Sequence, residues 1–324
     1  MVMGTSTIQR SVRIPAGEAA AYGPVGRSPW LDVDWRSHQR WLTVDGEVVN
    51  TIELGPDGAD RSQPLVFVHG LSGCWENFLE QLPVMARDHR VVTLDLPGFG
   101  YSPMPSKEIT ISGYGRLLDG LLGQLGIDAA AVVGNSMGGF IAAELAIAFP
   151  QRVERLVLVS PAGISTREPL APISPRLASR SPIPALTRIE RILAASAAGL
   201  ASRSDAVSRR ARLRELSLSL AVRHAGRLPG PLVAEQLRGV GKPGFLQAFA
   251  AIIDYDFEER LQEIACPTLI VWGDHDRLVP VRDADVFAAL IPDSRKVIFE
   301  DTGHMAMLER PAAFNALLRD FLAE

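Results

Sequence analysis

The chain reads Gly134-Asn135-Ser136-Met137-Gly138-Gly139 directly after an apolar run at residues 130–133 and directly before an apolar helical pattern that continues to residue 149. A G-x-S-x-G sequence between a strand and a helix predicts a sharp turn that lifts a serine hydroxyl above the edge of a sheet. The backbone at such a serine is strained, and glycines two positions away on either side leave room for the strand and helix to cross. We therefore expect a nucleophile elbow with Ser136 at its tip.

Two other interpretations of this stretch are a structural glycine-rich turn and a phosphate-binding loop. Both are weaker, because the stretch lacks the Lys-Ser or Lys-Thr ending of a P-loop and the glycine spacing of a dinucleotide-binding turn. Met137 begins the expected helix, so its amide points outward with the positive end of the helix dipole behind it. We expect this amide to stabilise an oxyanion.

A second amide for the oxyanion is expected from Phe67-Val68-His69-Gly70-Leu71-Ser72-Gly73, which continues from another apolar run. Gly70 allows the backbone to approach the serine closely, and this leaves the Leu71 amide as the partner of the Met137 amide. His69 ends the strand and precedes the glycine, so we interpret it as a residue that organises the loop and not as a catalytic base.

An unactivated serine is a poor nucleophile and needs an imidazole base, which a carboxylate holds in the correct tautomer. His304, in Asp301-Thr302-Gly303-His304-Met305, follows the last expected strand and precedes the last expected helix. Residues 272–280 offer two acids, Asp274 and Asp276. Asp274 directly follows the glycine that ends a strand, where a turn or capping role is common, so we expect Asp276 to orient His304.

The pattern around these motifs predicts an α/β fold. Residues 41–44 and 48–54 indicate an antiparallel hairpin. Continuous apolar runs, typical of parallel strands covered on both faces, follow at 65–68, 91–96, 130–133, 156–159, 268–272 and 296–299. Helical patterns alternate with them at 75–85, 112–125, 137–149, 281–290 and 311–321. We expect a mostly parallel eight-stranded sheet with helices on both faces.

The alternation of strands and helices stops after residue 163 and resumes at residue 268, which predicts a helical insertion after the sixth strand. The expected division is a leader at 1–40, a core at 41–163 and 256–324, and a helical cap, or lid, at 164–255. Between residues 176 and 238 the cap has twelve arginines against four acids. We expect these arginines to form a solvated outer face, the alternative being a surface for an acidic substrate or a membrane.

Composition limits the classes of partner. The formal charge of −4 over 324 residues gives no cationic field for nucleic acid, so a small molecule is the expected partner. The two cysteines, Cys74 and Cys266, indicate neither a disulfide framework nor a zinc site, and we expect no metal and no cofactor. The first 22 residues contain no signal-peptide core and no later run is long and apolar enough to cross a membrane, so a cytoplasmic protein is expected.

From about residue 41 to residue 324 the chain resembles the α/β-hydrolase superfamily, whose chain order of Ser, Asp and His it shares. The landmarks are His69-Gly70, Asp95-Leu96-Pro97-Gly98-Phe99-Gly100-Tyr101-Ser102, the elbow, Gly273-Asp274-His275-Asp276 with Pro280, and Gly303-His304 with Glu309-Arg310-Pro311. The resemblance implies that Asp276 is the acid of the triad and that the insertion is the helical lid of the family.

Residue identities narrow the chemistry that this resemblance implies. Ser136 disfavours haloalkane dehalogenases and epoxide hydrolases, which use an aspartate at the elbow. The elbow is similar to that of the meta-cleavage C–C hydrolases, but Leu71-Ser72-Gly73-Cys74 and Met305 depart from their pattern. The ending Gly303-His304-Met305-Ala306-Met307-Leu308-Glu309-Arg310-Pro311 resembles capped esterases and lipases.

The expected function is therefore hydrolysis of a small carboxylic ester through an acyl-enzyme, as in a carboxylesterase or lipase, with Ser136, His304 and Asp276 as the triad. The alternatives are C–C hydrolysis, another acyl chemistry such as lactone, thioester or amide hydrolysis, and a non-enzymatic ligand receptor. Gly70, Trp75 and Phe249 are the expected substrate-binding residues. Apolar cap residues are expected to line an acyl or alcohol pocket, namely Leu186, Ile189, Leu193, Phe245 and Ile252. The oligomeric state is left open.

Overall fold

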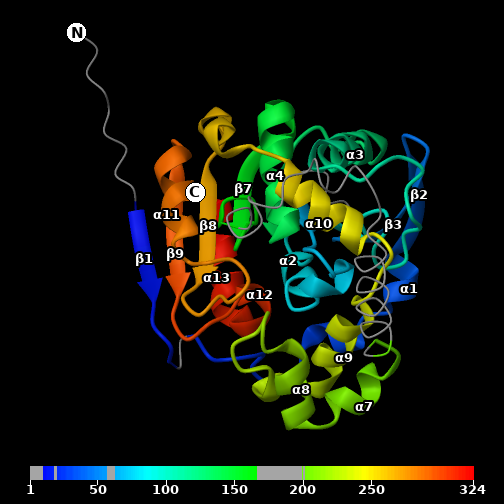
Figure 1. The fold of residues 1–324 in the computed structure, drawn as a ribbon, viewed down its shortest axis with the longest axis vertical. Coiled ribbons are helices and arrows are strands. Elements are labelled where there is room, and N and C mark those ends of the chain that lie inside the picture. The colour runs from blue at the N-terminus through cyan, green and yellow to red at the C-terminus, as the bar shows by residue number, and fades with distance from the viewer. Residues whose placement is uncertain (1–9, 18–19, 57–62, 166–198, 200) are drawn as a thin grey trace, which may run out of the picture.

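A computed structural model describes residues 10–17, 20–56, 63–165, 199 and 201–324. Their centre is a single nine-stranded sheet with the order β1-β9-β8-β7-β6-β4-β5-β3-β2 (Figure 1). The strands are β1 (Arg10–Ile14), β2 (Gln39–Val44), β3 (Glu47–Leu54), β4 (Leu65–Val68), β5 (Val91–Leu94), β6 (Ala130–Asn135), β7 (Val153–Val159), β8 (Thr268–Gly273) and β9 (Ser294–Phe299). Only the β2–β3 and β3–β5 pairs are antiparallel, so the predicted α/β fold with a mostly parallel sheet is confirmed.

The eight predicted strands correspond to β2 through β9, and β1 adds a ninth strand within the predicted leader. It pairs in parallel with β9 over five positions, from Arg10 opposite Arg295 to Ile14 opposite Phe299. The alternation of polar and apolar residues in Arg10-Ser11-Val12-Arg13-Ile14 suits a short edge strand, but five residues give too weak a pattern to predict one.

Helices cover both faces of the sheet and form two separate cores (Figure 1). On one face pack α3 (Ile111–Gln124), α4 (Met137–Ala148), α10 (Phe245–Asp254) and α11 (Asp283–Leu290). On the other face pack α2 (Leu82–Met85), α12 (Ala306–Glu309) and α13 (Pro311–Ala323). In β4, Leu65 and Phe67 join the second core while Val66 and Val68 join the first, because successive side chains of a strand point to opposite faces. This is why the predicted strands are continuously apolar.

The helix predicted at 75–85 is two shorter elements, the 3-10 helix η2 (Trp75–Phe78) and α2. Pro83 lies in the first turn of α2. Proline has no N–H to continue a helix from the preceding turn, so it begins a new helix there. The other 3-10 helices in the described residues are η1 (Pro29–Asp32), η3 (Pro150–Arg152), η5 (Ala225–Arg227) and η6 (Glu258–Glu263), and α1 (Trp35–His38) is a single turn.

The described part of the inserted cap contains α7 (Ser204–Ser208), α8 (Ala211–Leu218), α9 (Gly230–Arg238) and α10. Of its described arginines, six are exposed and two are half-buried, in agreement with a solvated outer face; the exposed ones are Arg203, Arg209, Arg210, Arg212, Arg227 and Arg238. Within the ranges given above, no helix is long and apolar enough to cross a membrane.

Candidate active site

Ser136 lies at the turn between β6 and α4 with φ of 55° and ψ of −118°, a backbone conformation that is strained for any residue with a side chain. The turn is held to the end of β7, because the Ser136 amide donates to the Val159 carbonyl at 2.9 Å. A Cβ atom at Gly134 would collide with the backbone of Gly138, and one at Gly138 would collide with the Val68 carbonyl. Gly134 is therefore required by the crossing of β6 and α4, and Gly138 by the close approach of α4 to the end of β4.

His304 lies in the loop between β9 and α12, and its ring faces Asp276. The distance from His304 Nδ1 to Asp276 Oδ2 is 2.7 Å, and the exposed fractions of the two side chains are 5% and 0%. The other carboxylate oxygen, Oδ1, accepts from the amides of Leu278 and Val279 at 2.8 and 2.9 Å. A carboxylate opposite Nδ1 places the ring proton there and leaves Nε2 as the acceptor, which is the tautomer that a general base needs.

Asp274, the alternative acid, does not contact His304. Its Oδ1 lies 2.7 Å from His275 Nδ1, and the Thr302 amide donates to the same oxygen at 3.4 Å. The structure thus brings Asp276, and not Asp274, against His304.

Asn135 brings the elbow and the His304 loop together. Its side-chain amide donates to the His304 carbonyl at 3.4 Å and to the Val159 carbonyl at 3.1 Å. Among the residues that the structure describes, the Ser136 hydroxyl makes no hydrogen bond. Catalytic hydrogen bonds of this kind are often long in a ligand-free enzyme and tighten in the complex with substrate.

The two expected oxyanion donors belong to the loop after β4 and to the start of α4. A Cβ atom at Gly70 would lie 3.0 Å from Ser136 Cβ, so the loop that carries Leu71 passes directly beside the serine. Met137 is the first residue of α4, and its amide has no partner within the helix. Both predicted donors therefore belong to segments that border the serine.

His69 is completely buried beneath this loop and holds it in place. Its Nδ1 lies 2.8 Å from the Gly70 carbonyl, and its Nε2 accepts from the Leu96 amide at 3.0 Å. This pattern requires the proton on Nδ1, and burial lowers the pKa of His69, which keeps the ring neutral. The contacts agree with the predicted loop-organising role.

The structure describes the surroundings of two of the predicted substrate-binding side chains, Trp75 and Phe249. The ring of Trp75 packs against Trp35, with centroids 4.8 Å apart, and lines a cavity that includes none of the three triad residues. Phe249, on α10, is 39% exposed, and its ring stacks on that of Phe245 with the ring centroids 6.1 Å apart. Ile252 is buried where α10 packs on the core. The remaining predicted pocket residues, Leu186, Ile189 and Leu193, lie outside the described residues.

Glu309 is a structural residue of the site whose role the sequence did not reveal. Its buried carboxylate accepts from the amides of Gly303 at 3.0 Å and Arg223 at 2.9 Å, and from the Tyr22 hydroxyl at 2.7 Å. Burial raises the pKa of Glu309. It joins the residue before His304 to the cap and to the N-terminal segment. Its place in the Glu309-Arg310-Pro311 landmark was the only signal in the sequence.

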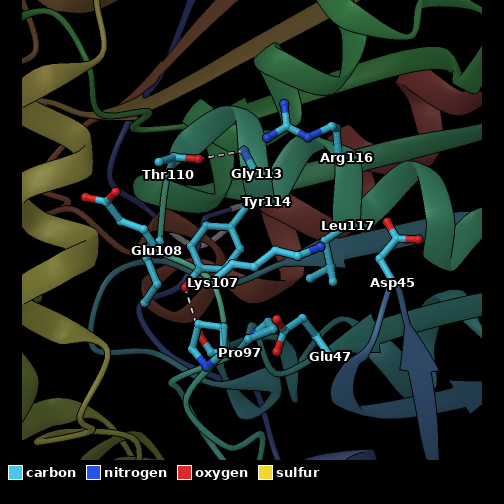
Figure 2. A pocket seen from close by; sticks show the side chains of 12 residues that line it. Asp45, Glu47, Pro97, Lys107, Glu108, Thr110, Gly113, Tyr114, Arg116 and Leu117 are labelled. Atoms are coloured by element: carbon cyan, nitrogen blue, oxygen red, sulfur yellow. Dashed lines mark hydrogen bonds between the residues drawn. The ribbon is translucent and has the colours of Figure 1, made fainter.

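A cavity of about 160 Å³ lies between the turn after β2 and the start of α3, and none of the three triad residues lines it (Figure 2). Charged side chains of both signs line it, including Glu47, Lys107 and Arg116, with Tyr114 as its one aromatic ring. Within the described ranges no cluster of three or more metal-ligating side chains occurs, and both cysteines are free thiols.

Comparisons with a family model, with curated relatives and with solved structures all place this chain among alpha/beta hydrolases. A family model described as alpha/beta hydrolase fold matches residues 63–311. A 2-hydroxy-6-oxononadienedioate/2-hydroxy-6-oxononatrienedioate hydrolase from Cupriavidus pinatubonensis is 32% identical over 297 residues, which cover 87% of this chain and 94% of that protein. A 2-hydroxy-6-oxo-6-phenylhexa-2,4-dienoate hydrolase from Burkholderia cepacia is 27% identical, covering 88% and 96%. Among solved structures, a membrane phospholipase A described as a bacterial virulence factor has a TM-score of 0.67 and 26% identity, covering 88% and 85%.

Proposed function

This chain belongs to the alpha/beta hydrolase fold family, and we propose that it is a serine hydrolase whose nucleophile, base and orienting acid are Ser136, His304 and Asp276. The observation that carries the proposal is the 2.7 Å contact between His304 Nδ1 and Asp276 Oδ2 beside the strained serine turn. A buried carboxylate with that geometry has the function of orienting an imidazole and stabilising its protonated form.

The reaction begins with attack of Ser136 Oγ on a carbonyl carbon while His304 Nε2 takes the hydroxyl proton. The amides of Leu71 and Met137 stabilise the resulting oxyanion. When the tetrahedral intermediate collapses, His304 returns the proton to the leaving group. Water, with His304 again as base, then releases the acid from Ser136.

We propose that the bond cleaved is a C–C bond next to the ketone of an unsaturated 2-hydroxy-6-oxo acid. Three curated relatives at 31–32% identity are named as hydrolases of such compounds, and this favours the C–C alternative over the expected ester. Another relative at 32% identity is named as the acetyltransferase component of an acetoin cleaving system. The 2-hydroxydienoate must first ketonise, with its hydroxyl proton transferred to C5, because a vinyl carbon cannot delocalise the electron pair of the broken bond. After attack of Ser136 Oγ on the C6 carbonyl, the C5–C6 electron pair delocalises through the remaining double bond onto the 2-oxo group, and protonation of that oxygen gives the 2-hydroxydienoate product. The triad and oxyanion donors serve this reaction without change.

Ester hydrolysis is the second candidate. It is favoured by the solved phospholipase A at 26% identity and by the similarity of residues 303–311 to capped esterases and lipases. The two candidates share the acyl-enzyme and differ only in the atom that leaves, so the choice of bond is made by the substrate pocket.

The purified protein should be assayed with 2-hydroxy-6-oxo-6-phenylhexa-2,4-dienoate and with p-nitrophenyl butyrate. We expect kcat/KM for the dienoate to be at least about a hundredfold larger. A larger value for the ester would overturn C–C specificity but leave the serine mechanism in place. Equal rates for wild type and Ser136→Ala on both compounds would remove the serine mechanism itself.

A further inference from the structure

A second cavity, of about 440 Å³, lies between the N-terminal segment and the elements behind the oxyanion loop. Residues of η1, α1 and β2 form one side, and residues of η2 and α9 form the other. Ser136, Asp276 and His304 do not line it. The catalytic mechanism therefore gives this cavity no role.

Aromatic rings dominate the walls of the cavity. Four of the five tryptophans in the chain line it, together with Tyr101; they are Trp30, Trp35, Trp41 and Trp75. Trp30 and Trp75 are only 7% and 6% exposed, whereas Trp41 is 53% exposed. The indole N–H of Trp30 donates to Glu80 at 2.8 Å and that of Trp35 donates to the Trp30 carbonyl at 3.1 Å. These internal hydrogen bonds hold both rings in place at the wall.

A glutamate with one unpartnered oxygen lies among these rings, while hydrogen bonds to Cys74 and to its own backbone involve the same carboxyl group. Glu76 is 7% exposed, and its Oε2 is buried without a hydrogen-bond partner among the described residues. The other acid of the lining, Glu235, is already paired with Arg238 at 2.6 Å, and the one cation of the lining, Arg36, is exposed. When Glu76 is ionised, its negative charge costs free energy at this buried position, and the positive charge of a bound cation would offset that cost.

We propose that this cavity binds a small organic cation, an alkylammonium or quaternary ammonium group, between the tryptophan rings and Glu76. Aromatic faces attract a desolvated cation, and several rings around one site are the arrangement that recognises quaternary ammonium groups. Lys242 Nζ already lies 6.0 Å from the Tyr101 ring centroid, at the distance of a cation–π contact. The cavity of Figure 2, with one aromatic ring, lacks this arrangement.

Binding should depend on pH through Glu76. Burial and the negative charge of Asp95 raise the pKa of Glu76 to about 8, so at neutral pH most molecules carry a protonated Glu76. The other titratable or charged groups around it are Cys74, Glu235, Tyr101 and Arg36. If the cation binds the ionised form, its affinity rises about tenfold between pH 7 and pH 9, where Glu76 becomes largely ionised.

Tryptophan fluorescence reports on this cavity, because the fifth tryptophan, Trp272, is fully buried in the core and does not line it. Choline and, in a separate experiment, its uncharged analogue 3,3-dimethylbutan-1-ol should each be titrated into the protein at pH 7 and pH 9. We expect a saturable fluorescence change with choline that is about tenfold tighter at pH 9, and no saturation with the alcohol in the same range.

Two variants and one control variant distinguish choline binding in this cavity from an unspecific effect of choline on tryptophan fluorescence. Glu76→Gln should weaken choline binding at least about tenfold at pH 9 and remove its pH dependence. Trp35→Leu should weaken it at both pH values, and Glu108→Gln, an exposed acid lining the cavity of Figure 2, should change neither affinity nor pH dependence. Calorimetric titration of the wild type with choline measures the same affinities at both pH values independently of fluorescence and of any substitution. Equal binding of choline and the alcohol, or pH-independent binding of choline, would overturn the proposal.

Discussion

Asp276 reaches His304 with one carboxylate oxygen and the backbone with the other. Oδ2 lies 2.7 Å from His304 Nδ1, while Oδ1 accepts from the amides of Leu278 and Val279. Because both oxygens are occupied, the carboxylate cannot rotate without losing contacts, and the imidazole opposite it has one orientation. The orientation of the base is thus built into the loop that follows β8.

Asp276→Asn should therefore lower kcat by about 10³- to 10⁴-fold, because an amide in place of Oδ2 favours the wrong imidazole tautomer. Asp274→Asn is the matched control two residues away, and it should change kcat less than about tenfold since Asp274 contacts His275 and Thr302 instead. Steady-state kinetics on the best substrate found in the dienoate and ester assays measures both. The opposite ranking would assign the orienting role to Asp274.

His69 gives a prediction about the oxyanion loop. His69→Leu removes the contact to Gly70 and leaves the Leu96 amide buried without its acceptor, so the free energy of unfolding should fall by about 2–4 kcal/mol. Because the loop carries Leu71, kcat should fall more than KM changes. His89→Leu, which removes one half-buried contact to Gln63, is the control and should cost less than about 1 kcal/mol. Urea unfolding and kinetics check this, and normal kcat in a less stable variant would limit His69 to a structural role.

The elbow and the loop after β4 were predictable from sequence because each has a short-range cause. Gly134 and Gly138 are required by steric contact, and Gly70 by the approach of its loop to Ser136. The fold was predictable for a related reason, since each of β4 to β9 has an apolar stretch that contributes to both cores and these strands alternate with helices.

The contacts that join distant segments were not predictable in the same way. Trp75 follows the oxyanion loop closely in sequence, but its ring packs against Trp35, forty residues earlier in the chain. Glu309 receives hydrogen bonds from Tyr22 and Arg223, which no local pattern connects with it. Such contacts depend on how the N-terminal segment and the cap pack on the core, and periodicity carries no information about that packing.

Glu76 gives a prediction about stability and pH. Its pKa is about 8 in the folded protein against an ordinary value of 4.5, so above pH 4.5 the unfolded chain binds fewer protons at this group than the folded protein does. This group therefore lowers the free energy of unfolding as the pH rises from about 5 to about 8. In Glu76→Gln that decline should be smaller, as measured by urea unfolding at pH 5, 7 and 9. Parallel curves for the two proteins would mean that Glu76 does not titrate in this window.

Glu309 gives the sharpest test of how the cap and N-terminal segment support the catalytic loop. The Glu309 carboxylate accepts from the Gly303 amide, the Arg223 amide and the Tyr22 hydroxyl. In Glu309→Gln an NH2 group replaces one of the two carboxylate oxygens, so a side-chain donor then faces a backbone or hydroxyl donor in a buried site. The free energy of unfolding should fall by about 2–4 kcal/mol, and kcat should fall as well because Gly303 precedes His304. Tyr22→Phe removes one of these hydrogen bonds and also the one that the His224 amide donates to the Tyr22 hydroxyl, so it should cost about 1–2 kcal/mol with nearly normal kcat. Urea unfolding and steady-state kinetics on both variants measure the free energy of unfolding and kcat. Equal losses of stability in the two variants would show that Glu309 acts through its contact with Tyr22 and not through its support of Gly303.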